Sequence, residues 1–289
     1  MNCGTFHRVI VIHLRFLSRS MKELALKVWR RDQLDFEPKR HNFIIRLLAI
    51  SFIFGLSWGC NDMNDSDKRQ FFKIAHRGAS AYEPENTLRS FRRAMEMGAE
   101  MMEFDVRLSS DGHLVIIHDK KVDRTTNGKG LVREMTLSEL KKLDAGKGEK
   151  IPTFEEVLDL AKGKIKLVVE LKDKGTEEKV IKMVKENGLI EDVFLVSFHC
   201  DLVKTAKSLE PRIRTGLIML FSFDTVAKGK ECHVDAVAPS HYFITGGMVE
   251  RVHKSGMYLF TWTVDDPKKA RKLKEMGVDG VVTNKPDLI

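Results

Sequence analysis

The chain has 289 residues, of which 43% are hydrophobic and 31% are charged, and this length allows one large domain or two small ones. Such a composition is ordinary for a globular protein and excludes a disordered, collagen-like or polytopic membrane protein. Of the net charge of +8, most lies in residues 1–60, which carry ten Lys and Arg against four Asp and Glu and leave 39 against 37 for the rest. This nearly neutral remainder has no basic stripe with interleaved aromatic residues, so we expect no nucleic-acid partner.

Residues 1–60 combine a basic segment with an apolar one. All ten basic residues lie at or before Arg46, and no charged residue occurs from Leu47 to Asn61. With its apolar part at 43–60, this segment is predicted to be a signal sequence or a membrane anchor. A buried or amphipathic helix is the alternative, but the apolar residues lie on every side of such a helix rather than on one stripe. A start at Met21 or later is a further alternative.

The apolar run ends at Cys60, and polar residues follow. This arrangement resembles the lipidation site of a bacterial lipoprotein, although Ser57 and Trp58 depart from the pattern of leucine and small residues before the cysteine. An uncleaved single anchor is therefore the alternative to a lipid at Cys60. In both versions the basic flank predicts a cytoplasmic N-terminal side and an extracytoplasmic, membrane-anchored body, which a polar tether at 61–71 would hold near the membrane.

From residue 72 to residue 289, short apolar runs alternate with stretches that carry helix start and stop signals, such as the Thr153 and Glu156 capping box and Pro267 after Asp266. This alternation predicts βα units around a parallel sheet, and eight runs fit a (β/α)8 barrel. The eight predicted strands are FKIAH (72–76), MMEFDV (101–106), IKLVVEL (165–171), VFLVSF (193–198), IRTGLI (213–218), DAVAP (235–239), YLFTWTV (258–264) and GVVT (280–283).

A ninth run, HLVIIHD at 113–119, follows the second strand after the short link SSDG. Because this link is too short for a parallel crossover, the two runs are predicted to form an antiparallel hairpin. Centring the turn between Ser110 and Asp111 places Glu103 across from His118. We expect an insertion at about 111–151, before the second helix.

The four cysteines match neither a disulfide framework nor a paired zinc spacing. A bond between Cys200 and Cys232 is one alternative, but we expect two free thiols.

Charged residues end several predicted strands, and in a (β/α)8 barrel the strand ends at one face carry the catalytic groups. Glu103 and Asp105 are two residues apart, so both side chains lie on one face of their strand, and Glu170 and Lys172 have the same spacing. Each group alone also has a purely structural interpretation: a histidine whose ring nitrogens are hydrogen-bonded within the fold, or an ion pair exposed to solvent. The residues expected at this rim are His76, Arg77, Glu103, Asp105, His118, Asp119, Glu170, Lys172 and Trp262.

Carboxylates that face the inside of a barrel are costly unless a charge compensates them. A hard divalent cation removes that cost, and oxygen ligands favour Ca²⁺ or Mg²⁺. Zinc is a weaker alternative that depends on His118 as a nitrogen ligand.

Nine short motifs follow one another in a fixed order: H-R-G at 76–78, P-E-N-T at 84–87, E-x-D at 103–105, D-G at 111–112, H-D at 118–119, E-L-K at 170–172, S-F at 197–198, W-T-V at 262–264 and V-D-G-V-V-T-N-K-P at 278–286. From about residue 72 to the C-terminus the chain thereby resembles the glycerophosphodiester phosphodiesterases of bacteria. The resemblance implies a barrel with a small insertion, and a metal-dependent hydrolysis of small glycerophosphodiesters to sn-glycerol 3-phosphate and an alcohol.

Carried over by position, the resemblance implies Glu103, Asp105 and Glu170 as metal ligands and His76 and His118 as the acid–base pair. It places Arg77, Lys172 and Trp262 at the substrate. His199 departs from the acidic or polar residue that usually follows S-F, and substrate choice depends on this position.

Two other functions fit the same residues. A lysophospholipase D would use them on a lyso-lipid held at the membrane, and an apolar groove beside the rim would favour it. An inactive barrel that binds phosphodiesters or mediates adhesion is opposed by the presence of every expected ligand and both histidines.

Overall fold

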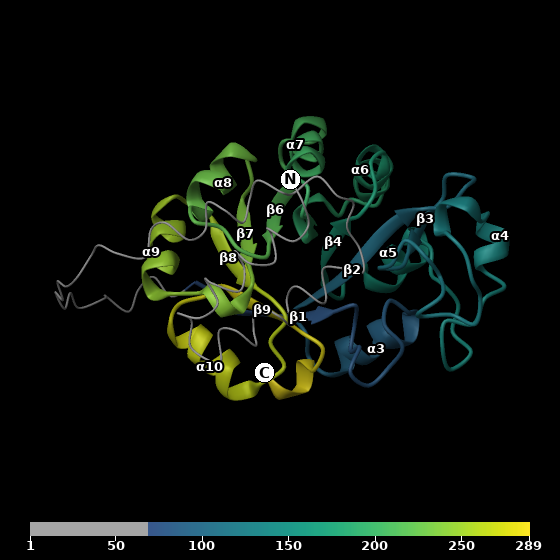
Figure 1. Ribbon diagram of the computed structural model, residues 1–289, viewed down its shortest axis with the longest axis horizontal. Helices are drawn as coiled ribbons and strands as arrows, with labels where there is room; N and C mark the ends of the chain where they lie inside the picture. The colour runs from purple at the N-terminus through teal and green to yellow at the C-terminus, as the bar shows by residue number, and fades with distance from the viewer. Residues whose placement is uncertain (1–68) are drawn as a thin grey trace, which may run out of the picture. The chain divides into compact units, whose positions relative to one another are not determined.

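Eight strands pair in parallel and close into a barrel, as the alternation of strands and helices predicts (Figure 1). The computed structural model of the protein describes residues 69–289. The strand order is β1-β9-β8-β7-β6-β5-β4-β2, and pairing of β1 with β2 closes the ring. The barrel strands are β1 (Phe72–His76), β2 (Met101–Leu108), β4 (Lys166–Leu171), β5 (Val193–Ser197), β6 (Arg214–Met219), β7 (Ala236–Pro239), β8 (Tyr258–Thr261) and β9 (Gly280–Thr283). The predicted fold class is confirmed.

Helices surround the strands (Figure 1), and two of them begin at the residues that the sequence marks. The capping box of Thr153 and Glu156 starts one of them, and Asp266 caps another whose first residue is Pro267. None of the helices within residues 69–289 is both long enough and apolar enough to cross a bilayer. The helices around the barrel are α3 (Leu88–Glu96), α5 (Phe154–Ala161), α6 (Thr176–Glu186), α7 (Cys200–Leu209), α8 (Thr225–Glu231), α9 (Gly246–Lys254) and α10 (Pro267–Glu275), with short 3-10 turns η4 (Ile190–Asp192), η5 (His241–Phe243) and η6 (Pro286–Leu288).

The inside of the barrel is apolar near the N-terminal ends of the strands and charged near their C-terminal ends. In the apolar part, Phe194 and Phe260 meet edge to face, with ring centroids 5.8 Å apart. Since side chains along a strand alternate between the two faces, Met101 in the apolar layer is followed on the same face by Glu103 and then Asp105. Apolar side chains therefore fill the N-terminal part of the barrel interior, and charged side chains lie above them at the C-terminal rim.

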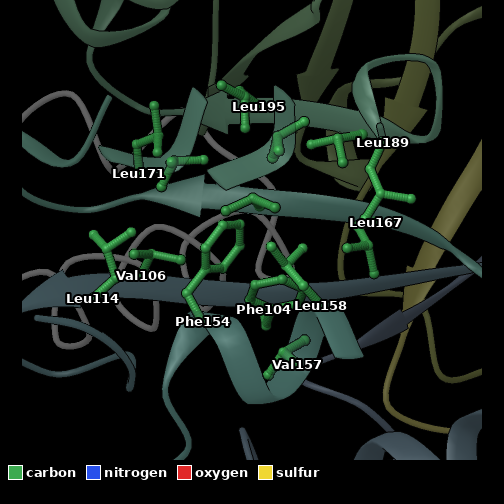
Figure 2. Packing of buried hydrophobic residues seen from close by; sticks show 14 of the residues in the cluster. Phe104, Val106, Leu114, Phe154, Val157, Leu158, Leu167, Leu171, Leu189 and Leu195 are labelled. Carbon is green, nitrogen blue, oxygen red and sulfur yellow. The ribbon is translucent and has the colours of Figure 1, made fainter. Parts of the chain in front are cut away.

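The outer faces of the strands pack against the helices. Phe104 of β2 lies against Phe154 of α5, with ring centroids 6.0 Å apart, and Leu158 and Leu167 join the same cluster, as Figure 2 shows. These side chains are removed from water almost completely, which stabilises each by roughly 1.5–3 kcal/mol. This cluster holds β2 and β4, which carry all three candidate metal ligands, in a fixed position.

The predicted hairpin is present, but its register is off by one residue. β3 (Leu114–Ile116) pairs antiparallel with β2, with Leu108 opposite Leu114, so the turn is centred on Asp111 itself. Gly112 has a φ of +78°, which lets the chain turn in an odd number of residues. The ladder ends at Ile116, and the prediction that His118 lies directly across from Glu103 is wrong.

The segment between β3 and α5 forms a lobe beside the barrel with its own small core. Val122, Val132, Leu140 and Ile151 are buried together in it. Its short elements are η3 (Val132–Glu134) and α4 (Leu137–Leu140). We call this segment, residues 117–153, the insertion; the range of about 111–151 expected from the sequence also included the turn after β2 and β3 itself.

The expectation of two free thiols at Cys200 and Cys232 is also wrong, because the two residues form a disulfide with their Cα atoms 5.3 Å apart. It joins the first residue of α7 to the residue that caps the C-terminal end of α8. The predicted signal or anchor at 43–60, the lipidation at Cys60, the alternative start at Met21 and most of the tether at 61–71 lie outside the described residues.

Candidate active site

Three carboxylates from two neighbouring strands meet at the C-terminal rim of the barrel. One oxygen from each of Glu103, Asp105 and Glu170 lies within 4.8 Å of the others, and all three residues are buried. The pairing of β2 with β4 sets Asp105 directly beside Glu170, while the two-residue spacing adds Glu103 on the same face. The sequence-predicted trio is thus brought together.

The electrostatics of this trio favour a bound cation. Burial raises the pKa of Glu103 well above its ordinary value, and the charges of Asp105 and Glu170 raise it further. Burial also raises the pKa of Glu170, despite a Lys172 Nζ that lies 2.7 Å from its Oε1. Three buried carboxylates with too little positive charge between them are a donor set that suits a divalent cation.

Asp105 is the member of the trio that stays ionised. Burial opposes its ionisation, but the charges of Arg77 and Lys172 outweigh burial and lower its pKa. The Nδ2 of Asn86 donates to Asp105 Oδ2 over 2.9 Å. The other oxygen of Asp105, Oδ1, is buried, lies 3.4 Å from Lys172 Nζ, and accepts no hydrogen bond from any described residue. Such an oxygen fits a metal ligand.

The H-R-G sequence begins at the last residue of β1, and the backbone conformation there explains its glycine. Arg77 and Gly78 have φ values of +54° and +81°, and the N–H of Arg77 turns to donate to Glu103 Oε2 over 2.9 Å. A Cβ at Gly78 would lie 2.3 Å from Ser90 Oγ and within 3.0 Å of the Ser90 backbone, so only glycine fits there. The Arg77 side chain extends over the cluster, with its Nε 3.2 Å from Asp105 Oδ2 and its guanidinium bonded to Glu85.

Two residues from the C-terminal part of the sequence, Asn284 and Asp265, orient the ring of His76 through consecutive hydrogen bonds. Asn284, just after β9, donates its Nδ2 to Asp265 over 2.7 Å, which turns its oxygen toward His76 Nδ1 at 2.7 Å. The Nδ1 of His76 must then carry the proton, which leaves Nε2 as an acceptor. Burial, with help from the charge of Arg77, lowers the pKa of His76 to about 4, so the ring is neutral at pH 7.

His118 reaches the same rim from the insertion. Its Nδ1 lies 2.6 Å from Asp119 Oδ1, and Arg107 Nε and Nη2 donate to its backbone carbonyl over 2.9 and 2.7 Å. The carboxylate orients the ring. The two predicted histidines therefore have different surroundings: His76 faces an amide, whereas His118 faces a carboxylate.

Trp262 belongs to an aromatic part of the rim. Its Nε1 donates to the Ala238 carbonyl over 2.8 Å, and its ring meets Phe198 edge to face at 5.6 Å. Lys172 Nζ lies 6.0 Å from the centre of the Phe198 ring, which connects this part to the charged cluster. Further aromatic residues follow β6 and β7. We call Phe198, Phe221, Phe223, Tyr242, Phe243 and Trp262 the aromatic arc.

Sequence reasoning did not assign roles to several residues that support the site. The motif P-E-N-T contains Glu85 and Asn86, and the motif V-D-G-V-V-T-N-K-P contains Asn284. Extending the strand-end rule to β9 would have identified Asn284. Arg124 carried no comparable signal, because it lies in the insertion between a lysine-rich stretch and a glycine-rich one.

Comparison with known proteins decides the family. The sequence model described as the glycerophosphoryl diester phosphodiesterase family matches residues 76–288, which include the whole barrel from the end of β1. The chain belongs to this family. It is accordingly a phosphoric diester hydrolase, as the order of its motifs predicted.

Individual relatives agree with this assignment. The chain is 42% identical over 232 residues to a glycerophosphodiester phosphodiesterase of Caldanaerobacter subterraneus, and the aligned region covers 75% of this chain and 95% of the relative. It is 30% identical over 276 residues to a glycerophosphodiester phosphodiesterase of Bacillus subtilis, covering 85% and 94%.

Solved structures of family members share the fold. A glycerophosphodiester phosphodiesterase from Agrobacterium tumefaciens is 31% identical with a TM-score of 0.71, covering 76% of this chain and 98% of that one. A phosphodiesterase from Oleispira antarctica, solved in complex with the product sn-glycerol-3-phosphate, is 32% identical with a TM-score of 0.69, covering 75% and 94%.

Proposed function

We propose that this phosphodiesterase hydrolyses glycerophosphodiesters to sn-glycerol 3-phosphate and an alcohol, with a divalent cation held by Glu103, Asp105 and Glu170. The observation that carries the proposal is the buried trio, whose pKa shifts and free Asp105 oxygen call for a cation. The product bound to the Oleispira relative supports the substrate class. The trio contains only oxygen donors, which favours Ca²⁺ or Mg²⁺ over zinc.

The cations of the site suit a phosphodiester anion. A divalent ion in the trio would supply neutralisation of the negative charge that builds on the phosphoryl oxygens. Arg77 and Lys172 lie at hydrogen-bonding distance from the trio, so their charges face the same place. A substrate phosphate at the trio would meet both positive charges.

The histidines divide the proton transfers between them. His76 is neutral and has its Nε2 free to accept a proton, so it acts as the base toward the attacking hydroxyl. His118, with Asp119 at its Nδ1, acts as the acid that protonates the departing alkoxide. In a glycerol diester the attacking hydroxyl is the neighbouring one on the glycerol, which gives a cyclic phosphate that water opens in the reverse sense.

Product analysis tests this proposal. With glycerophosphocholine as substrate, ³¹P NMR is expected to show sn-glycerol 3-phosphate as the final product and a cyclic glycerol phosphate as a transient species before it. Formation of phosphocholine and glycerol would contradict the assigned bond cleavage.

The aromatic arc supports a second candidate function, lysophospholipase D. Phe223 is 65% exposed and Tyr242 56% exposed, and the arc begins beside the charged cluster at Phe198. Exposed aromatic side chains at a catalytic rim suit an acyl chain. If the protein hydrolyses a lyso-lipid, Phe223→Ser lowers kcat/KM for lysophosphatidylcholine and leaves kcat/KM for glycerophosphocholine unchanged. The control Leu209→Ser, at an exposed position on α7, changes kcat/KM for neither substrate. Equal effects of both variants on both substrates exclude this candidate.

We also propose that the barrel is exported and anchored by residues 43–60. The disulfide between Cys200 and Cys232 supports export, because such bonds persist in oxidising compartments. Arg69 contacts Met257 and Tyr258 just before and at the start of β8, so the tether would join the barrel at the face away from the active site. Cys60→Ser tests the anchor: lipidation predicts failed maturation and changed mobility on a gel, whereas an uncleaved helix predicts no change. Full-length wild-type protein found only in the cytoplasm contradicts both.

A further inference from the structure

Arg124 of the insertion joins two carboxylates that serve different parts of the active site. Its Nη1 and Nη2 donate to the two oxygens of Glu85 over 2.8 and 2.7 Å. Its Nε and Nη2 donate to the two oxygens of Asp119 over 2.7 and 3.0 Å. One guanidinium thus makes two forked pairs at once.

Each of these carboxylates holds a residue at the reacting centre. Asp119 Oδ1 lies 2.6 Å from His118 Nδ1, and Glu85 Oε1 accepts from Arg77 over 2.8 Å. The contacts therefore run without a break from His118 through Arg124 to Arg77, which itself lies over Asp105. Arg124 reaches neither the trio nor a reacting atom, because Glu85 and Asp119 stand between.

The geometry requires arginine for this task. Glu85 and Asp119 would repel each other without a cation between them, and only a planar guanidinium offers enough donors in fixed directions to bond both carboxylates by two oxygens each. Burial opposes ionisation of Glu85, yet the hydrogen bonds of Arg124 and the charge of Arg77 hold the pKa of Glu85 below its ordinary value. Half of the Arg124 side chain is exposed, so its effect depends on the fixed geometry rather than on charge alone.

We propose that Arg124 is a positioning residue that fixes the orientations of His118 and Arg77 together. The inference rests on the proposed roles of these two residues in phosphodiester hydrolysis. It gives the insertion a function, since the segment that follows β3 carries both the histidine and the arginine that orients it. Misplacement of a catalytic group by about 1 Å costs up to about 10² in rate.

The test compares Arg124→Ala and Arg124→Lys with a matched control, Arg89→Ala, whose partner Glu83 lies in the same loop as Glu85 but outside this network. Arg124→Ala is expected to lower kcat by about 10-fold to 10²-fold in a protein that remains folded at the assay temperature. Arg124→Lys keeps the charge but not the fork, and stays nearer to the alanine variant than to wild type. Added guanidinium at a non-denaturing concentration restores part of the activity of Arg124→Ala only.

A double-substituted background shows whether Arg124 acts through the two carboxylates. In Asp119→Asn with Glu85→Gln, the further change Arg124→Ala is expected to add no loss in kcat. A loss of the same size in both backgrounds would overturn the proposal, because Arg124 would then act by another route.

An NMR readout keeps this test separate from the proposed function. The short contact with Asp119 gives the Nδ1 proton of His118 a downfield resonance, which Arg124→Ala is expected to shift or broaden and Arg89→Ala to leave in place. An unchanged resonance in Arg124→Ala overturns the positioning role. A wild-type protein that hydrolyses no glycerophosphodiester refutes the proposed function instead, and the resonance still decides the role of Arg124.

Discussion

The side-chain oxygen of Asn284 lies 2.7 Å from His76 Nδ1, so a residue that follows the last strand fixes the proton of a residue that ends the first. This contact exists only because β9 pairs with β1 when the barrel closes. It leaves Nε2 of His76 as the proton acceptor.

Replacing Asn284 with alanine is expected to lower kcat by about 10² or less, since His76 stays present but loses its fixed tautomer. Asn284→Asp keeps an acceptor at Nδ1 and adds a negative charge, which raises the pKa of His76. The pH dependence of kcat/KM should therefore move its acidic limb upward in Asn284→Asp alone. The same limb in both variants would contradict the contact's role.

The wild-type pH profile follows from the lowered pKa of His76. With a pKa of about 4 the ring is neutral above that pH, so kcat/KM is expected to rise near pH 4 and not near 6.5. The same shift affects stability: between these values the unfolded chain binds the proton and the folded one does not, so stability falls as pH is lowered from 6.5 to 4. Thermal melts across this range check the second part, and His76→Ala should flatten the dependence.

Glu103→Gln separates the two consequences of the carboxylate trio. Without metal, Glu103 has a raised pKa, so the folded state loses stability as pH rises above 4.5. Glu103→Gln removes this repulsion and is expected to melt higher than wild type in chelator, yet to gain less from added Ca²⁺ or Mg²⁺. Calorimetry in both conditions measures the difference. A variant that melts lower than wild type in chelator would show that the trio is not destabilising by itself.

Much of the barrel could be predicted because its signals are local. The eight strands are short apolar runs, and the two-residue spacing of Glu103 and Asp105 places both inside the barrel without any knowledge of the tertiary structure. The parallel pairing of β2 with β4 then brings in Glu170, as the strand-end rule implied.

The parts that the sequence did not reveal depend on loops and on contacts between helix ends that are distant in the sequence. The disulfide was missed because nothing local to Cys200 or Cys232 indicates that the start of α7 meets the end of α8. The hairpin register was missed because Gly112, with its positive φ, permits an odd turn. The role of Arg124 depends on the path of the insertion, which has no periodic pattern to follow.

Gly78 provides a stability test of the close approach at the active site. Gly78→Ala places a Cβ 2.3 Å from Ser90 Oγ and also strains a positive φ, so we expect it to cost about 3 kcal/mol or more. Gly163 has a φ of +70° with nothing within 4 Å of its added Cβ, and Gly163→Ala should cost only about 1–2 kcal/mol. Denaturant unfolding measures both, and equal costs would contradict the steric argument.

The disulfide predicts a stability effect that leaves the chemistry intact. Cys200→Ser removes a link that closes a loop of sequence separation 32 and is expected to cost about 3 kcal/mol. Reductant should lower the melting temperature of the wild type but not of the variant. An effect of reductant on both alike would mean that the bond is not formed.

The central claim is that Glu103, Asp105 and Glu170 hold a cation without which the phosphodiester is not cleaved. The most direct measurement is turnover of glycerophosphocholine by the purified protein after chelation, and again after addition of single metals. We expect negligible turnover in chelator, recovery with Ca²⁺ or Mg²⁺, and no recovery in Glu103→Gln, Asp105→Asn or Glu170→Gln, since the cation supplies several kcal/mol of transition-state stabilisation. Full turnover in chelator, with the three variants as active as wild type, would contradict the account.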